Sequence, residues 1–332
     1  MTGSTIKAEV LKQETGPGRL GFLLDFSKNN PAVIFLLVLI SLGAIFSPVF
    51  LTVNNLLNIL WTVSVLGIVA LGQTMLLITG NFDMSVAYII GLAGISTVLS
   101  QMMGADLVTS VIIGLLAGGL VGLLNGIIIV LTKANAFLIT LGTAILVYSV
   151  NLILTQSKTY YASIEAFLLL GRGKIFGGIY YSVIIFLVIA FILQMILKHT
   201  TYGRSLYIIG LNQRAGKLAG IKTDTIKIAT YIFCGMTAAL AGLVMTARTG
   251  STVGNAGVGM EFESLIASVL GGTSLFGGRG GTMRTVIGVL VMGVLNNLLI
   301  LLNIPYEAQQ IAKGSVFLFV VFLDGAFQGS RR

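Results

Sequence analysis

Ten runs of apolar residues divide this chain of 332 residues, and most are long enough for a helix to cross a lipid bilayer. Backbone N–H and C=O groups cannot stay unpaired in lipid, so such runs predict membrane-spanning helices. The eighth run is short and contains Gly271 and Gly272, which predicts a broken or partly re-entrant helix. We therefore predict an all-α, polytopic integral membrane protein with about ten transmembrane helices. The ten runs are residues 32–51, 56–79, 84–103, 107–132, 136–155, 179–197, 228–248, 264–276, 285–302 and 308–323.

Charged residues are few and unevenly placed. They make up 9% of the chain, whereas soluble domains carry about 25%. If the N-terminus is cytoplasmic and the ten helices alternate in direction, 15 of the 20 lysines and arginines fall on the cytoplasmic side and four on the other. This bias follows the positive-inside rule and predicts that both termini are cytoplasmic. The net charge of +9 has the same origin, so we expect contacts with membrane lipid and none with nucleic acid.

The segments between the apolar runs are too short to fold as separate domains. We predict a single transmembrane domain over residues 31–325, with a cytoplasmic loop at residues 198–227. A cytoplasmic tail of mixed charge, residues 1–30, precedes the domain, and a second cytoplasmic tail, residues 326–332, follows it. The first apolar run has full membrane length, which a secretory signal peptide does not.

The chain carries little material for catalysis. Its one cysteine is Cys234 and its one histidine is His199, so a disulfide within the chain and a cysteine or histidine metal cluster are excluded. No phosphate-binding G-x-x-x-x-G-K-[ST] motif is present, because Gly171–Lys174 lacks its spacing and its Ser/Thr. We expect no enzyme activity, no metal and no cofactor bound by this chain. A pump built on it would need a separate ATPase that uses ATP and magnesium.

Five polar residues in or beside the apolar runs are candidates to line a transport pathway. Asp83 and Ser85 stand just before the third run, where capping of the new helix is the alternative role. Lys313 lies inside the last run, where pairing or snorkelling is the alternative. Asn296 and Asn297 are adjacent within the ninth run, so at least one should bond across helices or face a polar pore.

The glycine-rich stretch at residues 270–281 has two interpretations. A phosphate cradle is one, but a lone glycine-rich loop is weak evidence for it. Close helix packing with a tight turn at the cytoplasmic face explains the glycines better.

The basic loop at residues 199–227 contains a short candidate helix. Residues 212–219 have helix-compatible composition, with Asn212 as the N-cap and Gly220 as the C-terminal stop. A short helix presented to the cytoplasm can dock a soluble partner, and a basic loop resting on anionic lipid head groups is the alternative.

Four stretches resemble the membrane permease subunit of bacterial ABC importers of the ribose/xylose/galactose type. Residues 80–86, GNFDMSV, resemble that family's G-I-D-L-S-V-G, and residues 136–143, AFLITLGT, resemble its P-F-I-x-T-L-G. Residues 202–221, YGRSLYIIGLNQRAGKLAGI, resemble its G-R-x-x-Y-A-I-G-G-N-x-x-A-A-x-L-x-G-I. Residues 263–282, ESLIASVLGGTSLFGGRGGT, resemble its D-x-I-A-A-V-V-L-G-G-T-S-L-x-G-G-x-G. The last two stretches are long and specific.

The resemblance implies a transport subunit with no catalysis of its own, in the bacterial cytoplasmic (inner) membrane. Its expected partners are cytoplasmic ATPase subunits, a periplasmic or surface substrate-binding protein, and a second permease, either identical or a sister subunit. The chain departs from the family at Gln213, where the family often has Glu, and at Gly216, where it has Ala. By the resemblance, ATPase coupling falls on Asn212, Gln213, Arg214, Ala215, Lys217, Leu218, Gly220 and Ile221.

The resemblance favours a monosaccharide, such as a pentose or hexose, as the substrate. Relatives of the same fold handle nucleosides, autoinducer-type furanosyl compounds or branched-chain amino acids, and these alternatives stay open. A stand-alone secondary carrier is a different class, and it should carry intramembrane acid or base relays, of which this sequence offers few. A membrane-embedded enzyme fits least well, because clustered Cys, His or paired carboxylates are missing from the runs.

Overall fold

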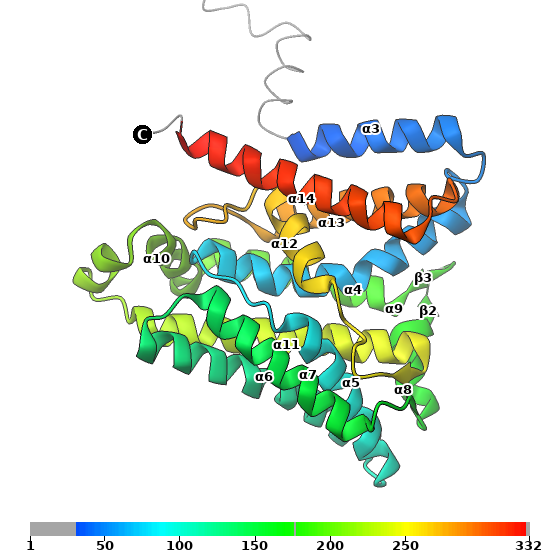
Figure 1. The fold of residues 1–332 in the computed structure, drawn as a ribbon, viewed down its shortest axis with the longest axis horizontal. Coiled ribbons are helices and arrows are strands. Elements are labelled where there is room, and N and C mark those ends of the chain that lie inside the picture. Colours follow the sequence, from blue (N-terminus) through cyan, green and yellow to red (C-terminus); the bar gives the residue numbers. More distant parts are fainter. Residues whose placement is uncertain (1–30, 176, 330–332) are drawn as a thin grey trace, which may run out of the picture.

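The computed structural model describes residues 31–175 and 177–329, and these residues are mostly helical (Figure 1). The predicted tail at residues 1–30 lies outside the described residues, as do residues 330–332. Most helices run side by side as a bundle, with α10 at one end of it and α8 at the other (Figure 1). The helices are α3 Pro31–Phe46, α4 Val53–Ile78, α5 Val86–Met102, α6 Leu107–Thr132, α7 Ala136–Thr155, α8 Glu165–Arg172, α9 Tyr181–His199, α10 Thr201–Leu218, α11 Thr223–Thr249, α12 Met260–Leu270, α13 Thr282–Leu301 and α14 Tyr306–Gly329.

Every apolar run predicted from the sequence overlaps a helix, which confirms a mostly helical membrane protein. Within the described residues, six helices (α4, α6, α7, α9, α11 and α13) are long and apolar enough to cross a membrane, while α3 and α5 are shorter apolar helices. Only residues 264–270 of the eighth run lie in α12, and residues 271–276 follow it as non-helical chain, so the run is a broken helix, as predicted. The 11 residues of α12 reach only about 16 Å at 1.5 Å per residue. A bilayer core is about 30 Å thick, so α12 alone is too short to cross it. The total of ten crossings and the cytoplasmic side of both termini stay predictions.

Glycines set the distance between α6 and α11 at the centre of the bundle. Gly118, Gly122 and Gly126 recur every fourth residue on one face of α6, and all three lie against α11. A Cβ added at Gly118 or Gly122 would overlap backbone atoms of α11, and one added at Gly235 of α11 would overlap Gly118. Such small-residue spacing lets two helix backbones approach closely in lipid. It explains why glycine is abundant in a chain of long helices.

The end of the bundle around α8 carries two small antiparallel sheets that the sequence did not predict (Figure 1). Strand β1, Tyr160–Tyr161, pairs with β4, Ser251–Thr252, and strand β2, Lys174–Ile175, pairs with β3, Ile179–Tyr180. Each strand has two residues, which is too short for an alternating sequence pattern to show.

Candidate functional site

Helix α10 is two helical pieces joined by a kink at Asn212, whose backbone is extended with φ −160° and ψ 101°. The Asn212 side-chain oxygen accepts a hydrogen bond from the Ala215 backbone N–H at 3.0 Å. This is the geometry of an N-cap, which satisfies a free N–H at a helix start. Gly220 then ends the segment with φ +80°, the left-handed conformation that glycine tolerates. The predicted cap and stop of the short helix are confirmed, whereas the first piece of α10 was not predicted as helical.

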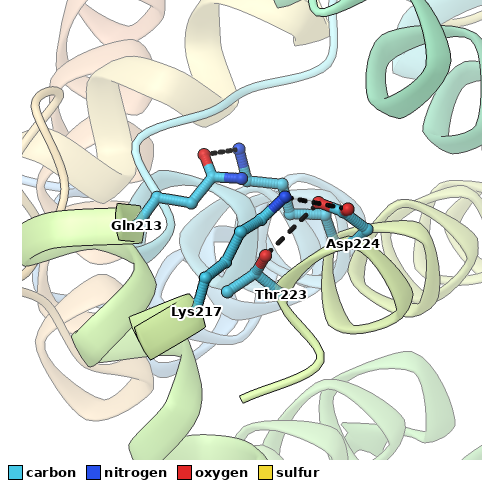
Figure 2. A network of polar contacts seen from close by, with 5 residues as sticks. Gln213, Lys217, Thr223 and Asp224 are labelled. Carbon is cyan, nitrogen blue, oxygen red and sulfur yellow. Dashed lines mark hydrogen bonds and ion pairs between the residues drawn. The ribbon is translucent and has the colours of Figure 1, made fainter. Parts of the chain in front are cut away.

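The short helix after the kink is tied to the start of α11 by two side-chain contacts (Figure 2). The Lys217 ammonium lies 3.0 Å from the Asp224 carboxylate, which also accepts a hydrogen bond from the Thr223 hydroxyl at 3.3 Å. The Lys227 ammonium donates to the Gln213 side-chain oxygen at 2.8 Å. Lys217 and Gln213, both expected to face a partner, are therefore engaged within the chain.

The outward face of the short helix is formed by Arg214, Ala215 and Leu218. All three are exposed, and Leu218 is 90% exposed, so its side chain has almost no contact with its own chain. Their spacing of one and four residues places them on one helical face. Gly216 is buried on the opposite face, near Ile208 and Thr223. This face therefore carries an exposed leucine beside an exposed arginine.

Four glycines join the first piece of α10 to the rest of the molecule, and we call them the glycine junction: Gly80, Gly210, Gly277 and Gly278. The Gly278 N–H donates to the carbonyl of Ile78, at the end of α4, at 2.9 Å. A Cβ added at Gly277 would lie 2.9 Å from the Gly80 nitrogen and 3.0 Å from the Gly210 Cα. Backbone therefore packs on backbone at this point. The glycine-rich stretch at residues 270–281 forms close packing, as the sequence analysis favoured.

A cavity of about 430 Å³ lies beside the glycine junction. Its lining includes Gln194 of α9, Tyr207 of α10, and Arg284 near the start of α13. The Tyr207 hydroxyl donates to the Gly280 carbonyl at 3.0 Å and so ties α10 to the glycine-rich loop on this side. Side chains of α9, α10 and α13 line this space without filling it.

Asp83 and Ser85, predicted as pathway candidates, are both completely buried. One Asp83 carboxylate oxygen accepts from the Ser85 N–H at 2.8 Å and from the Ser85 hydroxyl at 2.6 Å. The other oxygen accepts from the Asn125 amide at 3.1 Å, which links α5 to α6. The structure thus gives Asp83 the role of ordering the entry to α5 and leaves neither residue on an open surface.

The two adjacent asparagines of α13 have different surroundings. Asn297 and Asn55 of α4 exchange two amide hydrogen bonds, at 2.8 and 3.0 Å. This confirms that at least one asparagine bonds across helices. Asn296 is half-buried, and its side chain has no hydrogen bond among the described residues.

Lys313 of α14 pairs with Glu263 of α12, with 2.7 Å between the ammonium and the carboxylate oxygen. Pairing was one of the two roles expected for this lysine. The Lys313 side chain keeps 13% of its surface exposed and that of Glu263 keeps 25%, so the pair lies at a surface and is not sealed in the core.

Comparison with known proteins gives matches along nearly the whole chain. A family model described as "Branched-chain amino acid transport system / permease component" matches residues 55–321. The ribose import permease protein RbsC of Escherichia coli (strain K12) is 35% identical over 324 residues, covering 95% of this chain and 99% of the relative. The D-allose transport system permease protein AlsC of the same strain is 30% identical, covering 97% and 98%. The L-arabinose transport system permease protein AraH of that strain is 35% identical, covering 87% and 88%. No solved structure matches the chain.

Proposed function

The chain belongs to the family of branched-chain amino acid transport system permease components, and from this membership we propose that it is the membrane subunit of an ABC importer for a monosaccharide. The observation that carries the proposal is end-to-end similarity to permeases whose names specify ribose, allose and arabinose. Two of these sugars are pentoses and one is a hexose. Amino acids have less support, because they appear only in the family description. Nucleosides and furanosyl signals have less support because none of the names reported above mentions them.

An importer subunit also fits better than a stand-alone secondary carrier. The similar proteins are named as import permeases or transport-system permeases, and such subunits work with a separate ATPase. This chain is accordingly a transport subunit and not an enzyme. We propose that its complex uses ATP and magnesium in the partner ATPase and that the chain itself binds neither. Its long apolar helices make it a multi-pass membrane protein, for which we propose the bacterial inner membrane.

We assign ATPase contact to the short helix of α10. Its outward face offers Arg214, Ala215 and Leu218, while Gln213 and Lys217 brace it against α11. A push on this face is passed through the first piece of α10 to the glycine junction, and from there to the end of α4. The mechanism needs two arrangements of the spans, one open to each side of the membrane, biased by the nucleotide state of the ATPase. A binding protein delivers sugar at the end of the bundle opposite α10, and a second permease subunit completes the pathway.

Sugar uptake tests the proposal. Cells of the source organism, with and without the gene for this chain, are given radiolabelled ribose, arabinose and allose separately. We expect deletion to abolish uptake of one sugar and re-expression of the chain to restore it. Unchanged uptake of all three would exclude these substrates. Robust ATP hydrolysis by the purified chain alone would contradict the division of labour between permease and ATPase.

A further inference from the structure

Five polar side chains on four helices follow one another as neighbours. We call them the polar strip: Tyr148 of α7, Tyr88 of α5, Glu261 and Glu263 of α12, and Lys313 of α14. The rings of Tyr88 and Tyr148 lie 5.2 Å apart at 47°. Glu261 is close enough to Tyr88 to interact with it electrostatically, and Glu263 binds Lys313. Helix α12 contacts both α5 and α14, so the strip crosses adjacent elements.

The polar strip lies within the length of the bundle and not at its ends. Figure 1 places α12 between the end that carries α10 and the end that carries α8. Tyr148 lies about seven residues before the end of α7, and Lys313 about seven residues after the start of α14. At 1.5 Å per residue, each is roughly 10 Å inside its helix. Lys313 therefore lies well inside α14, whereas its partner Glu263 is the fourth residue of α12.

None of the five side chains is sealed inside the chain. Tyr88, Tyr148 and Glu261 are half-buried, and the Glu263–Lys313 pair is partly exposed. Asp83, by contrast, is completely buried among its hydrogen-bond partners. Ionisable groups within a membrane are costly to expose to lipid, and they face a partner or a water-filled cavity. Lys313 and Glu263 meet this requirement by facing each other, and the partly open surface of Glu261 remains for a polar partner.

We propose that the polar strip lines the path of the transported monosaccharide, an inference that rests on the importer function proposed above. A sugar presents hydroxyl groups around its edge and C–H groups on its faces. The Glu261 carboxylate and the tyrosine hydroxyls bond to hydroxyls, and the tyrosine rings pack against C–H faces. The Glu263–Lys313 pair supplies an acceptor and a donor at the edge of the strip. In the alternative arrangement, the strip is buried against a second copy of the chain, and the experiments below distinguish that arrangement from a sugar path.

The first test measures access of water to the strip in the assembled importer. Cys234 is the chain's single cysteine and is buried, so an introduced cysteine is the one exposed thiol of this chain, and labelling is read on this chain alone after the subunits are separated. Tyr148→Cys is compared with Leu146→Cys, two residues away on α7 at a position where leucine is 68% exposed. A thiol reacts as its thiolate, which forms poorly in apolar surroundings. We expect a water-soluble methanethiosulfonate to label Tyr148→Cys about tenfold faster than Leu146→Cys. Equal labelling, or none at residue 148, would overturn the proposal.

The second test measures uptake of the preferred sugar together with assembly of the complex. Tyr88→Phe and Glu261→Gln each remove one hydrogen-bonding group, and we expect the uptake rate to fall about tenfold with assembly unchanged. Tyr306→Phe and Glu307→Gln are matched controls at exposed positions outside the strip, and should leave uptake unchanged.

The two tests separate failure of the strip from failure of the importer function. Normal uptake in both strip variants overturns the strip assignment while leaving the importer function intact. Loss of uptake together with loss of assembly also overturns it, because the strip is then a contact between permease subunits. Absence of monosaccharide uptake by the unmodified importer is a failure of the proposed function itself.

Discussion

Replacing Gly210 with alanine should damage the protein far more than the same change at Gly216, six residues along the same helix. A Cβ at residue 210 would overlap the Ile78 carbonyl oxygen and the Gly278 amide nitrogen, both backbone atoms. Both separations fall under 3.0 Å, which real Cβ contacts essentially never do, so the backbone must move. That movement separates the hydrogen bond from the Gly278 N–H to the Ile78 carbonyl, now 2.9 Å long.

The two substitutions should differ in the sign of their effect on stability. Overpacking costs about 1–3 kcal/mol, and a lost backbone hydrogen bond about 1 kcal/mol, so Gly210→Ala should destabilise by about 2–4 kcal/mol. At Gly216 the nearest atoms to an added Cβ lie 3.5 Å away, on the Ile208 and Thr223 side chains, which is ordinary van der Waals contact. Alanine in place of glycine within a helix is worth about 0.5–1 kcal/mol, so Gly216→Ala should stabilise slightly.

Thermal unfolding of the purified chain in detergent, followed by tryptophan fluorescence, measures the difference. We expect a lower midpoint and reduced sugar uptake for Gly210→Ala. Its ATPase binding should be retained, because the outward face of the short helix is untouched. Gly216→Ala should unfold at or above the unmodified midpoint with normal uptake. If Gly210→Ala matched the unmodified chain, or if both variants were equally damaged, the glycine junction would not be the close backbone contact described above.

Two further expectations concern the short helix. Arg214→Glu should weaken association with the ATPase, measured by co-purification at low and high salt. Lys217→Ala should change the free energy of unfolding by less than about 1 kcal/mol, because its pair with Asp224 is half-exposed. Equal loss of the co-purified ATPase in both variants would contradict this division of roles. A third expectation concerns the amide pair: Asn297→Leu should destabilise by about 1–3 kcal/mol, because the Asn55 side-chain oxygen loses its donor while the Asn55 amide keeps only its bond to the Phe50 carbonyl. The double variant with Asn55→Leu should recover part of that loss in the same unfolding assay, and additive losses would argue against the pairing.

Local chemistry explains what the sequence predicted correctly. Asn212 and Gly220 act through their own backbone neighbourhoods, so a cap and a stop are visible in the order of residues. Helices as long as α6 and α11 are recognised in the sequence by their long apolar composition. The short strand pairs around α8 carry no such pattern, because two residues cannot show alternation.

Contacts between distant segments explain what was missed. Tyr88 and Glu261 belong to helices far apart in sequence, and neither stood out beside other tyrosines and glutamates. Lys217 was assigned to a partner because its pairing with Asp224 arises only when the loop folds back on α11. Asp83 was considered as a pathway residue, because the sequence alone does not show that the Asn125 amide donates a hydrogen bond to its carboxylate. The signal that could have found part of the polar strip is the position of two acids, Glu261 and Glu263, directly before the short eighth run.

The short length of α12 affects how the protein seals the membrane against small ions. A helix of about 16 Å occupies roughly half of a 30 Å hydrocarbon core, and glycine-rich backbone follows it. Helices α4, α13 and α14 contact α12 and must supply the rest of the seal across the core. The permeability to small ions between transport cycles then depends on how closely these three helices pack around the ends of α12.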